Sequence, residues 1–183
     1  MECSLKLLPL VFACLLSTSP LAQAASKPAA ATTEAHPDKT ATAQIQDVIE
    51  VFRTSIIKRD QAAFERLFLH PGITWQSVKS DEALRRVRQK APTASKLTVD
   101  TTKTPYSFIA GIVADKDSSE ETFDNVKIDT DGDIASVHFD YAFLRNGKET
   151  NHGQEAWHLL RTPDGWKIAS VIWSINLKPE PVN

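Results

Sequence analysis

The feature that most constrains this chain is a series of glycine-bearing turn sequences in its C-terminal part. Four stretches rich in β-branched and aromatic residues follow one another from Thr122 onward, separated by Asp131-Gly132, Asn146-Gly147 and Pro163-Asp164-Gly165. Glycine and asparagine tolerate the positive φ values that tight hairpins require. The pattern therefore predicts four consecutive strands linked by hairpins.

The turns also predict which side chains share a face. We expect a two-residue turn at Asp131-Gly132 and three-residue turns at 146–148 and 163–165. Since side chains alternate along a strand, this register brings the large residues to one inner face. The predicted inner rows are Ile128/Ala135/Leu159/Ala169, Val126/Val137/Trp157/Val171, Asp124/Phe139/Glu155/Trp173 and Thr122/Tyr141/Gly153/Ile175.

The opposite face of the predicted sheet is mixed in character. Its predicted residues are Ile134, Ser136, His138, Asp140, Ala156, His158, Leu160, Ile168, Ser170 and Ile172. Such an apolar surface is unfavourable in water and indicates a partner. A homodimer through this outer face is the simplest arrangement.

Helices are predicted before the sheet. Apolar residues at helical spacing predict a helix over about 43–59, capped by Thr40 or Thr42. Asp60 begins a second short helix that ends at Pro71-Gly72, and a short strand containing Trp75 follows.

A third helix is predicted to begin at Ser80, with Asp81 and Glu82 in its first turn and Ala83, Leu84 and Val87 buried. The segment 106–113 is apolar and fits either a short helix or a buried strand, because periodicity does not decide at that length.

The N-terminus is typical of an export signal. An apolar run over 7–16 follows Lys6 and precedes Ala22-Gln23-Ala24, which fits a signal peptidase site. The run is shorter than the roughly 20 residues a spanning helix needs. We therefore expect a signal peptide over 1–24, a disordered tether over 25–42, a domain over 43–178 and a tail over 179–183, with export to the periplasm or the medium. A lipoprotein anchor at Cys14 is the alternative, which Phe12 fits poorly.

Composition and charge exclude several functions. The formal net charge is −2, so a nucleic-acid binder, which needs a basic excess, is not expected. Cleavage after Ala24 would remove both cysteines, Cys3 and Cys14. The mature domain would then have no disulfide, no thiol nucleophile and no cysteine-based metal site.

The chain resembles the nuclear transport factor 2-like superfamily, in particular its SnoaL-like branch. The similarity covers about 45–175. The segments that carry it are 131–137, Tyr141-Ala142-Phe143, Asn146-Gly147-Lys148, 153–159 and 165–168, with a looser match at Arg59-Asp60, Phe64 and Leu67-Phe68. The resemblance implies an α+β cone, in which N-terminal helices pack on a curved antiparallel sheet around a conical pocket, with dimerisation through the sheet. Catalytic members often carry a His or an acid in the last strand, where this chain has Ser170-Val171-Ile172-Trp173-Ser174.

Two acids interrupt the predicted inner face. Asp124 and Glu155 would lie two strands apart, about 9–10 Å between Cα atoms. A carboxyl enclosed by aromatic rings is desolvated and its pKa rises, which suits a general acid or base. The predicted catalytic residues are Glu155, Asp124 and Tyr141, and the predicted pocket residues are Trp75, Phe139, Tyr141, Trp157 and Trp173. Alternatively, both acids lie hydrated or paired at the open rim.

Other polar residues form no recognisable site. The histidines follow no metal-binding spacing, and we expect no metal and no cofactor. Basic residues around the third helix, which include Arg85, Arg86 and Lys96, fit a solvated helix face. The favoured function is an exported domain that holds a small apolar or aromatic ligand. The alternatives are an isomerase, dehydratase or hydrolase that uses a pocket carboxylate, and an interaction module without a ligand.

Overall fold

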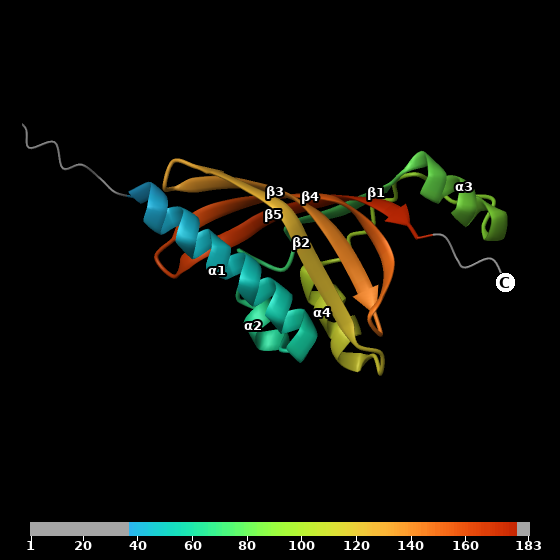
Figure 1. The fold of residues 1–183 in the computed structure, drawn as a ribbon, viewed down its shortest axis with the longest axis horizontal. Coiled ribbons are helices and arrows are strands. Elements are labelled where there is room, and N and C mark those ends of the chain that lie inside the picture. Colours follow the sequence, from blue (N-terminus) through green and yellow to red (C-terminus); the bar gives the residue numbers. More distant parts are fainter. Residues whose placement is uncertain (1–36, 179–183) are drawn as a thin grey trace, which may run out of the picture. The chain divides into compact units, whose positions relative to one another are not determined.

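A computed structural model describes residues 37–178 of the chain, with side chains from Ala41 onward. Helices precede the long strands, as predicted, and Figure 1 shows α1, α2 and α4 on one side of the sheet. The elements are α1 (Pro37–Lys58), α2 (Gln61–Glu65), β1 (Thr74–Lys79), α3 (Asp81–Lys90), α4 (Pro105–Ala114), β2 (Ser119–Thr130), β3 (Ile134–Arg145), β4 (Lys148–Thr162) and β5 (Gly165–Leu177). The predicted signal peptide and most of the predicted tether lie outside the described residues.

The sheet is curved, unclosed and mixed rather than wholly antiparallel. Its strand order is β1-β5-β4-β3-β2, so β1 and β2 form the two edges. The hairpin-linked strands β2 to β5 pair antiparallel, whereas β1 pairs parallel with β5 and places Trp75 opposite Val171. The expectation of an entirely antiparallel sheet is therefore corrected at this edge. A strand that arrives from the helical half of the chain has no hairpin to fix its direction.

The central register is as predicted. Phe139 pairs with Glu155, which pairs in turn with Trp173. In the neighbouring row, Trp157 pairs with Val137 and Val171. Trp157 and Trp173 consequently point to the same face of the sheet, the face that meets the helices.

Two hairpin turns are shorter than predicted. Arg145 pairs with Lys148, so the turn is only Asn146-Gly147, both at positive φ (51° and 72°). A bulge between Phe143 and Leu144 then restores the predicted register.

The β4–β5 hairpin behaves in the same way. Thr162 pairs with Gly165, and a bulge follows between His158 and Leu159. Between the turn and that bulge, Leu159 pairs with Ile168 rather than with Ala169. Ile168 is therefore fully buried, and its predicted position on the outer face is wrong.

The largest departure from the predicted register is in β2. Thr130 pairs with Ala135, so the Asp131-Gly132 hairpin has a longer loop than predicted. The register then shifts again between Asp124 and Lys127, where Asn125 has a φ of 54°. An odd shift exchanges the two faces of the strand. Upstream of Asn125, every predicted inward residue of β2 consequently faces outward.

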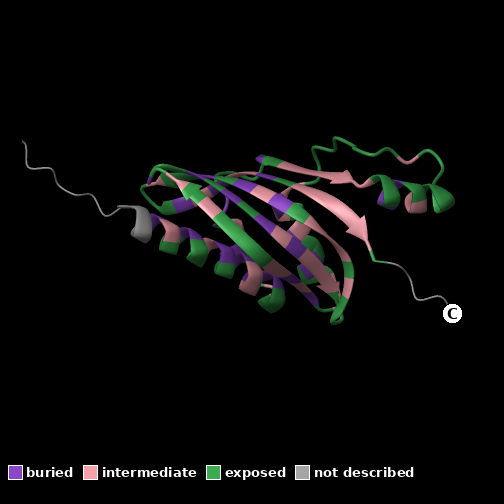
Figure 2. Cartoon of the chain, turned by 45° about the horizontal axis from the view of Figure 1, so that its top comes forward, coloured by how far each residue is buried: buried purple, intermediate pink, exposed green. Residues whose placement is uncertain are grey.

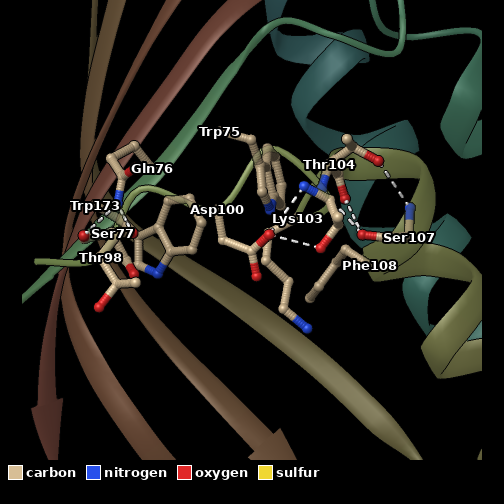
Figure 3. Close-up of a pocket in the computed structure, with 11 residues that line it drawn as sticks. Trp75, Gln76, Ser77, Thr98, Asp100, Lys103, Thr104, Ser107, Phe108 and Trp173 are labelled. Carbon is tan, nitrogen blue, oxygen red and sulfur yellow. Dashed lines mark hydrogen bonds between the residues drawn. The ribbon is translucent and has the colours of Figure 1, made fainter. Parts of the chain in front are cut away.

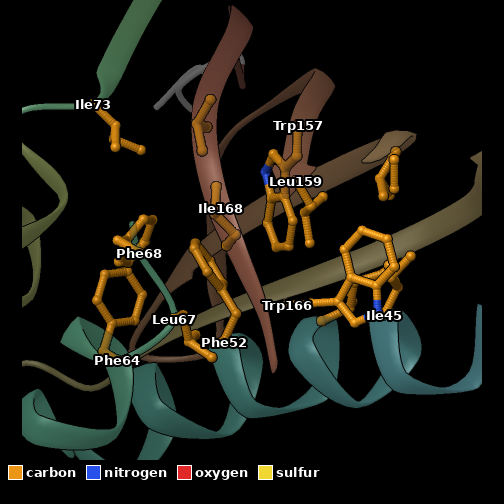
Figure 4. Close-up of a cluster of buried hydrophobic side chains, with 14 of the residues drawn as sticks. Ile45, Phe52, Phe64, Leu67, Phe68, Ile73, Trp157, Leu159, Trp166 and Ile168 are labelled. Carbon is orange, nitrogen blue, oxygen red and sulfur yellow. The ribbon is translucent and has the colours of Figure 1, made fainter. Parts of the chain in front are cut away.

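The core lies between α1 and the inner face of the sheet, as Figure 4 shows. Phe52 of α1 packs on Trp157 with ring centroids 4.8 Å apart, and Ile45 and Ile56 are fully buried on the same helix. The alternation of buried and exposed residues along the strands is visible in Figure 2. The predicted apolar stripe of this helix is confirmed.

The helix boundaries differ in part from the predictions. α1 begins at Pro37, so 37–42 belong to the helix rather than to a tether, and neither Thr40 nor Thr42 caps it. Asp60 and Ser80 cap α2 and α3 as predicted. The undecided segment 106–113 is helical and lies within α4.

The four helices occupy different places on the sheet. α1 contacts β2 and β5, and α2 packs against both α1 and α4. α3 instead contacts β5 and β1, away from α1 and α2 in Figure 1. α4 reaches β1 through Phe108, whose ring centroid lies 5.5 Å from that of Trp75. The segment 91–104, which contains no helix or strand, accepts a hydrogen bond from Gln76 of β1 at the Thr98 carbonyl.

Candidate functional site

A partly open cavity of about 210 Å³ lies between α4 and the inner face of the sheet. We call it the inner chamber. Most of its wall is aromatic, and two carboxyl groups complete it. Its lining residues are Trp75, Phe108, Glu121, Tyr141, Phe143, Asn151, Glu155, Trp173 and Ile175.

A second cavity of about 440 Å³ adjoins the first, and we call it the outer chamber. The two chambers share Trp75, Phe108 and Trp173 as lining residues. The rest of the outer wall is polar and comes mainly from β1, the segment 91–104 and the start of α4, as Figure 3 shows. The site thus passes from a polar mouth to an aromatic interior.

The shared aromatic residues come from three separate elements. Trp75 of β1 lies 5.1 Å from Trp173 of β5 and 5.5 Å from Phe108 of α4, between ring centroids. Phe108 in turn lies 6.1 Å from Phe143 of β3. Such tilted and edge contacts are favourable for aromatic rings and fix their relative orientation.

Local hydrogen bonds define the outer chamber. Thr104 caps α4 through the backbone N–H of Ser107, whose hydroxyl accepts from the Thr104 N–H in return. The Asp100 carboxylate accepts from the N–H and the hydroxyl of Thr102. These bonds give the segment before α4 a defined conformation although it lacks regular secondary structure.

The two carboxyl groups of the inner chamber come from β2 and β4 and are buried together. Glu121 and Glu155 are only 5% and 4% exposed, and their side chains share a hydrogen bond. The indole N–H of Trp157 donates to Glu155 Oε1 at 2.5 Å.

Burial determines the protonation of this pair. It raises the pKa of Glu155 to about 7, although the hydrogen bonds from Trp157 and Glu121 lower it. Burial first, and then the neighbouring charge of Glu155, raises the pKa of Glu121 well above its usual value. Near neutral pH, Glu121 therefore keeps its proton, and its O–H donates a hydrogen bond to Glu155.

The Tyr141 hydroxyl is anchored beside the pair. Its Oη lies 2.9 Å from the Ser174 carbonyl oxygen and 3.0 Å from Asn151 Oδ1, so it donates to one of these acceptors at a time. Burial, together with the charges of Glu121 and Glu155, raises the pKa of Tyr141. Tyr141 therefore stays protonated and can accept a hydrogen bond from a ligand.

Gly153 lets β4 approach β5 closely at the Ser174 carbonyl, which accepts from Tyr141. A Cβ at this position would lie 2.1 Å from the Ser174 carbonyl oxygen, so only glycine permits the close approach of β4 and β5 here. We expect Gly153→Ala to lower the free energy of unfolding by about 1–3 kcal/mol. Chemical denaturation measures this loss. Gly111→Ala is the control, because no atom lies within 4 Å of its added Cβ and α4 should be unchanged or slightly stabilised. Equal stability of the two variants would contradict the close approach.

The structure places four predicted site residues at the inner chamber. Trp75, Tyr141, Glu155 and Trp173 line it. The predicted pocket residues Phe139 and Trp157 are instead fully buried in the core, with ring centroids 5.0 Å apart. They support the chamber without lining it.

The predicted inward position of Asp124 is wrong. Asp124 is exposed and pairs with Asp140 on the outer face of the sheet. Glu121, which lies opposite Phe143 rather than Phe139, supplies the second carboxyl of the inner chamber instead. The only sequence signal for this exchange is Asn125, since asparagine tolerates the left-handed conformation of a bulge.

The remaining polar candidates are accounted for locally. Arg86 and Lys96 pair with Glu82 and Asp81, as expected of a solvated helix face. Among residues 37–178, no three His, Cys, Asp or Glu side chains gather to hold a metal ion. No helix in the same range is long and apolar enough to cross a membrane.

Comparisons with known proteins identify the fold. No family model matches the sequence, and no curated protein matches it. Among solved structures, an NTF2-like superfamily protein from Salmonella enterica matches with a TM-score of 0.54 and 19% identity, covering 79% of this chain and 96% of its own. An NTF2-like family protein from Streptomyces avermitilis, described as a proposed dehydratase, matches with a TM-score of 0.56 and 19% identity over 78% and 99% of the two chains. An NTF2-like protein from Novosphingobium aromaticivorans matches at 0.52 and 13% identity, over 75% and 83%.

The order of elements, the curved sheet and these matches together define an α+β protein of the nuclear transport factor 2-like fold. The identities are low, so the similarity establishes the fold and leaves the function to be argued from the site.

Proposed function

We propose that this chain is an exported, SnoaL-like small-molecule-binding domain that holds an aromatic or apolar ligand in its two chambers. The observation that carries the proposal is the inner chamber of about 210 Å³, walled by rings from α4, β1, β3 and β5 and open to a polar mouth. Binding sites for small molecules combine such apolar walls with a few placed polar groups. An interaction module with a filled interior is disfavoured because side chains leave both chambers unfilled.

Export and dimerisation form part of the proposal. The signal sequence over 1–24 supports export. On the outer face, a groove of about 350 Å³ includes Leu97, Ala156 and Ile172, and Ile172 is 48% exposed. A second copy of the chain would cover this apolar surface.

Native mass spectrometry of the protein, produced with its own N-terminus and purified without denaturation, tests these points together. We expect the mass of residues 25–183, two subunits per particle, and an additional small mass that is lost on denaturation. A retained N-terminus would contradict export after Ala24, and a monomer would contradict the dimer. Chambers that carry no molecule and take up no added aromatic probe would contradict the binding function.

A proton-transfer enzyme of the same fold is the second candidate. The specific observation in its favour is the Glu121–Glu155 pair, because a carboxyl with a pKa of about 7 can both accept and return a proton at neutral pH. Glu155→Gln separates the two functions. A binding protein would largely retain its affinity for an uncharged aromatic ligand, whereas an enzyme would lose about 10²–10⁴-fold in turnover.

A further inference from the structure

The inner chamber contains buried acids without a compensating cation. Apart from Tyr141, its ionisable residues are Glu121 and Glu155, and no lysine, arginine or histidine of the stretch 37–178 lines it. The Trp157 N–H is the one protein N–H that reaches the pair within this stretch. A buried carboxylate in such surroundings is unstable unless a positive charge joins it.

The aromatic walls of the inner chamber also favour a positively charged ligand. Trp75, Phe108, Phe143 and Trp173 surround the space in front of the two carboxyls. Aromatic faces attract cations through their quadrupole, and the attraction is larger where water is excluded. A neutral head group would gain little from this combination, and an anionic one would be repelled by the carboxyls.

We propose that the inner chamber binds the protonated amino group of an organic ammonium ligand, with Glu121 and Glu155 as its counter-charge and the rings of Trp75 and Trp173 against its carbon skeleton. The inference rests on the proposed ligand-binding function and specifies its ligand class. A primary ammonium group also offers three N–H donors for the two carboxyls and the Tyr141 oxygen, in addition to the Trp157 N–H that already donates to Glu155.

The outer chamber does not change this preference. Its two ionisable side chains are Asp100 and Lys103, which carry opposite charges and line the same mouth (Figure 3). The remaining lining consists of hydroxyl, amide and aromatic groups. The part of the ligand that extends into this chamber is therefore expected to be polar and need not be charged.

Binding of an ammonium ion is coupled to the titration of the pair. Because burial raises the pKa of Glu155 to about 7, the pair is largely neutral at pH 6 and carries a negative charge at pH 8. The other ionisable groups that line the two chambers are Tyr141, Asp100 and Lys103, and His138 lines the outer-face groove beside Glu155. Affinity should therefore rise between about pH 6 and pH 8, and binding near pH 6 should release a proton.

The test uses three probes that share one ring and differ in charge: phenethylammonium, phenethyl alcohol and phenylacetate. Isothermal titration at pH 7.5 should show phenethylammonium binding about tenfold more tightly than the alcohol, with phenylacetate weakest. The double variant Glu121→Gln/Glu155→Gln keeps the size of both side chains and should abolish the preference. Asp124→Asn, which removes an exposed carboxylate from the neighbouring outer face, should retain it.

A second measurement does not depend on the folding of any variant. Titrations of the natural protein at pH 6 in buffers of different ionisation enthalpy report proton release on binding, which the proposal requires. Equal affinity for the ammonium and the alcohol, a preference that survives the double variant, or the absence of proton release would each overturn the ammonium inference while a small-molecule site remains. Failure of all three probes to bind, with no molecule retained by the purified protein, would overturn the proposed function as well.

Discussion

Truncation of Trp157 to alanine is expected to lower the free energy of unfolding by about 3–5 kcal/mol, as for other aromatic residues deleted from a core. Trp157 is fully buried, and its ring centroid lies 4.8 Å from that of Phe52 and 5.0 Å from that of Phe139. Deletion of the indole would leave a cavity at the junction of α1 and the sheet. Urea denaturation measures the loss.

Two further variants identify the cause of this loss of stability. Trp75→Ala removes a partly exposed ring from the chamber wall and should cost less than Trp157→Ala. Trp157→Phe keeps most of the packing but removes the N–H that donates to Glu155. Since that hydrogen bond lowers the pKa of Glu155, the pKa should rise further in Trp157→Phe. A loss in Trp157→Ala no larger than in Trp75→Ala would contradict the central position of Trp157.

The free energy of unfolding is also expected to fall as the pH rises from about 5 to about 8. Glu155 has a pKa of about 7 in the folded protein, against an ordinary value of 4.5. Below pH 4.5 both the folded and the unfolded states hold the proton, and stability is greatest. Above that value the unfolded chain releases the proton first, so stability decreases until the folded protein also loses it. The pKa difference corresponds to a loss on the order of 3 kcal/mol across this range.

The carboxyls of Asp131 and Asp140 titrate below this interval. Hydrogen bonds lower the pKa of Asp131 and of Asp140, so their contributions to stability disappear only at more acidic pH. Thermal denaturation from pH 5 to pH 8 should show the decrease. Glu121→Gln should flatten it, because the glutamine amide donates to ionised Glu155, while Asp124→Asn should leave it unchanged. A profile of the natural protein that is flat or rises with pH would exclude a buried, proton-sharing pair.

Much of the fold could be predicted because local patterns and tertiary packing agree. The apolar spacing of Ile45, Phe52 and Ile56 predicted the buried stripe of α1, and the turn glycines predicted the hairpins. In the centre of the sheet, the pairings of Glu155 with Phe139 and of Trp157 with Val137 were correct. Errors in turn length at both flanking hairpins were cancelled by bulges, which leave no distinct sequence pattern.

The candidate site could be predicted only in part. Glu155, Tyr141 and the tryptophans followed from the correct central register, whereas Glu121 was missed because the error in β2 was not compensated. Phe108 was also missed, since its segment did not distinguish helix from strand. The parallel pairing of β1 was unpredictable because it depends on long-range contacts with β5 rather than on a local turn.

The bulge at Asn125 makes the acidic interior tolerant of a change in the length of β2. Three steps along β2, from Asp124 to Lys127, face two steps along β3, so Asn125 is the surplus residue. Its deletion would leave Asp124 opposite Asp140 and Glu121 opposite Phe143 in an uninterrupted ladder, and Glu121 would still face inward. A strand shortened at this exposed position should therefore keep both buried carboxyls.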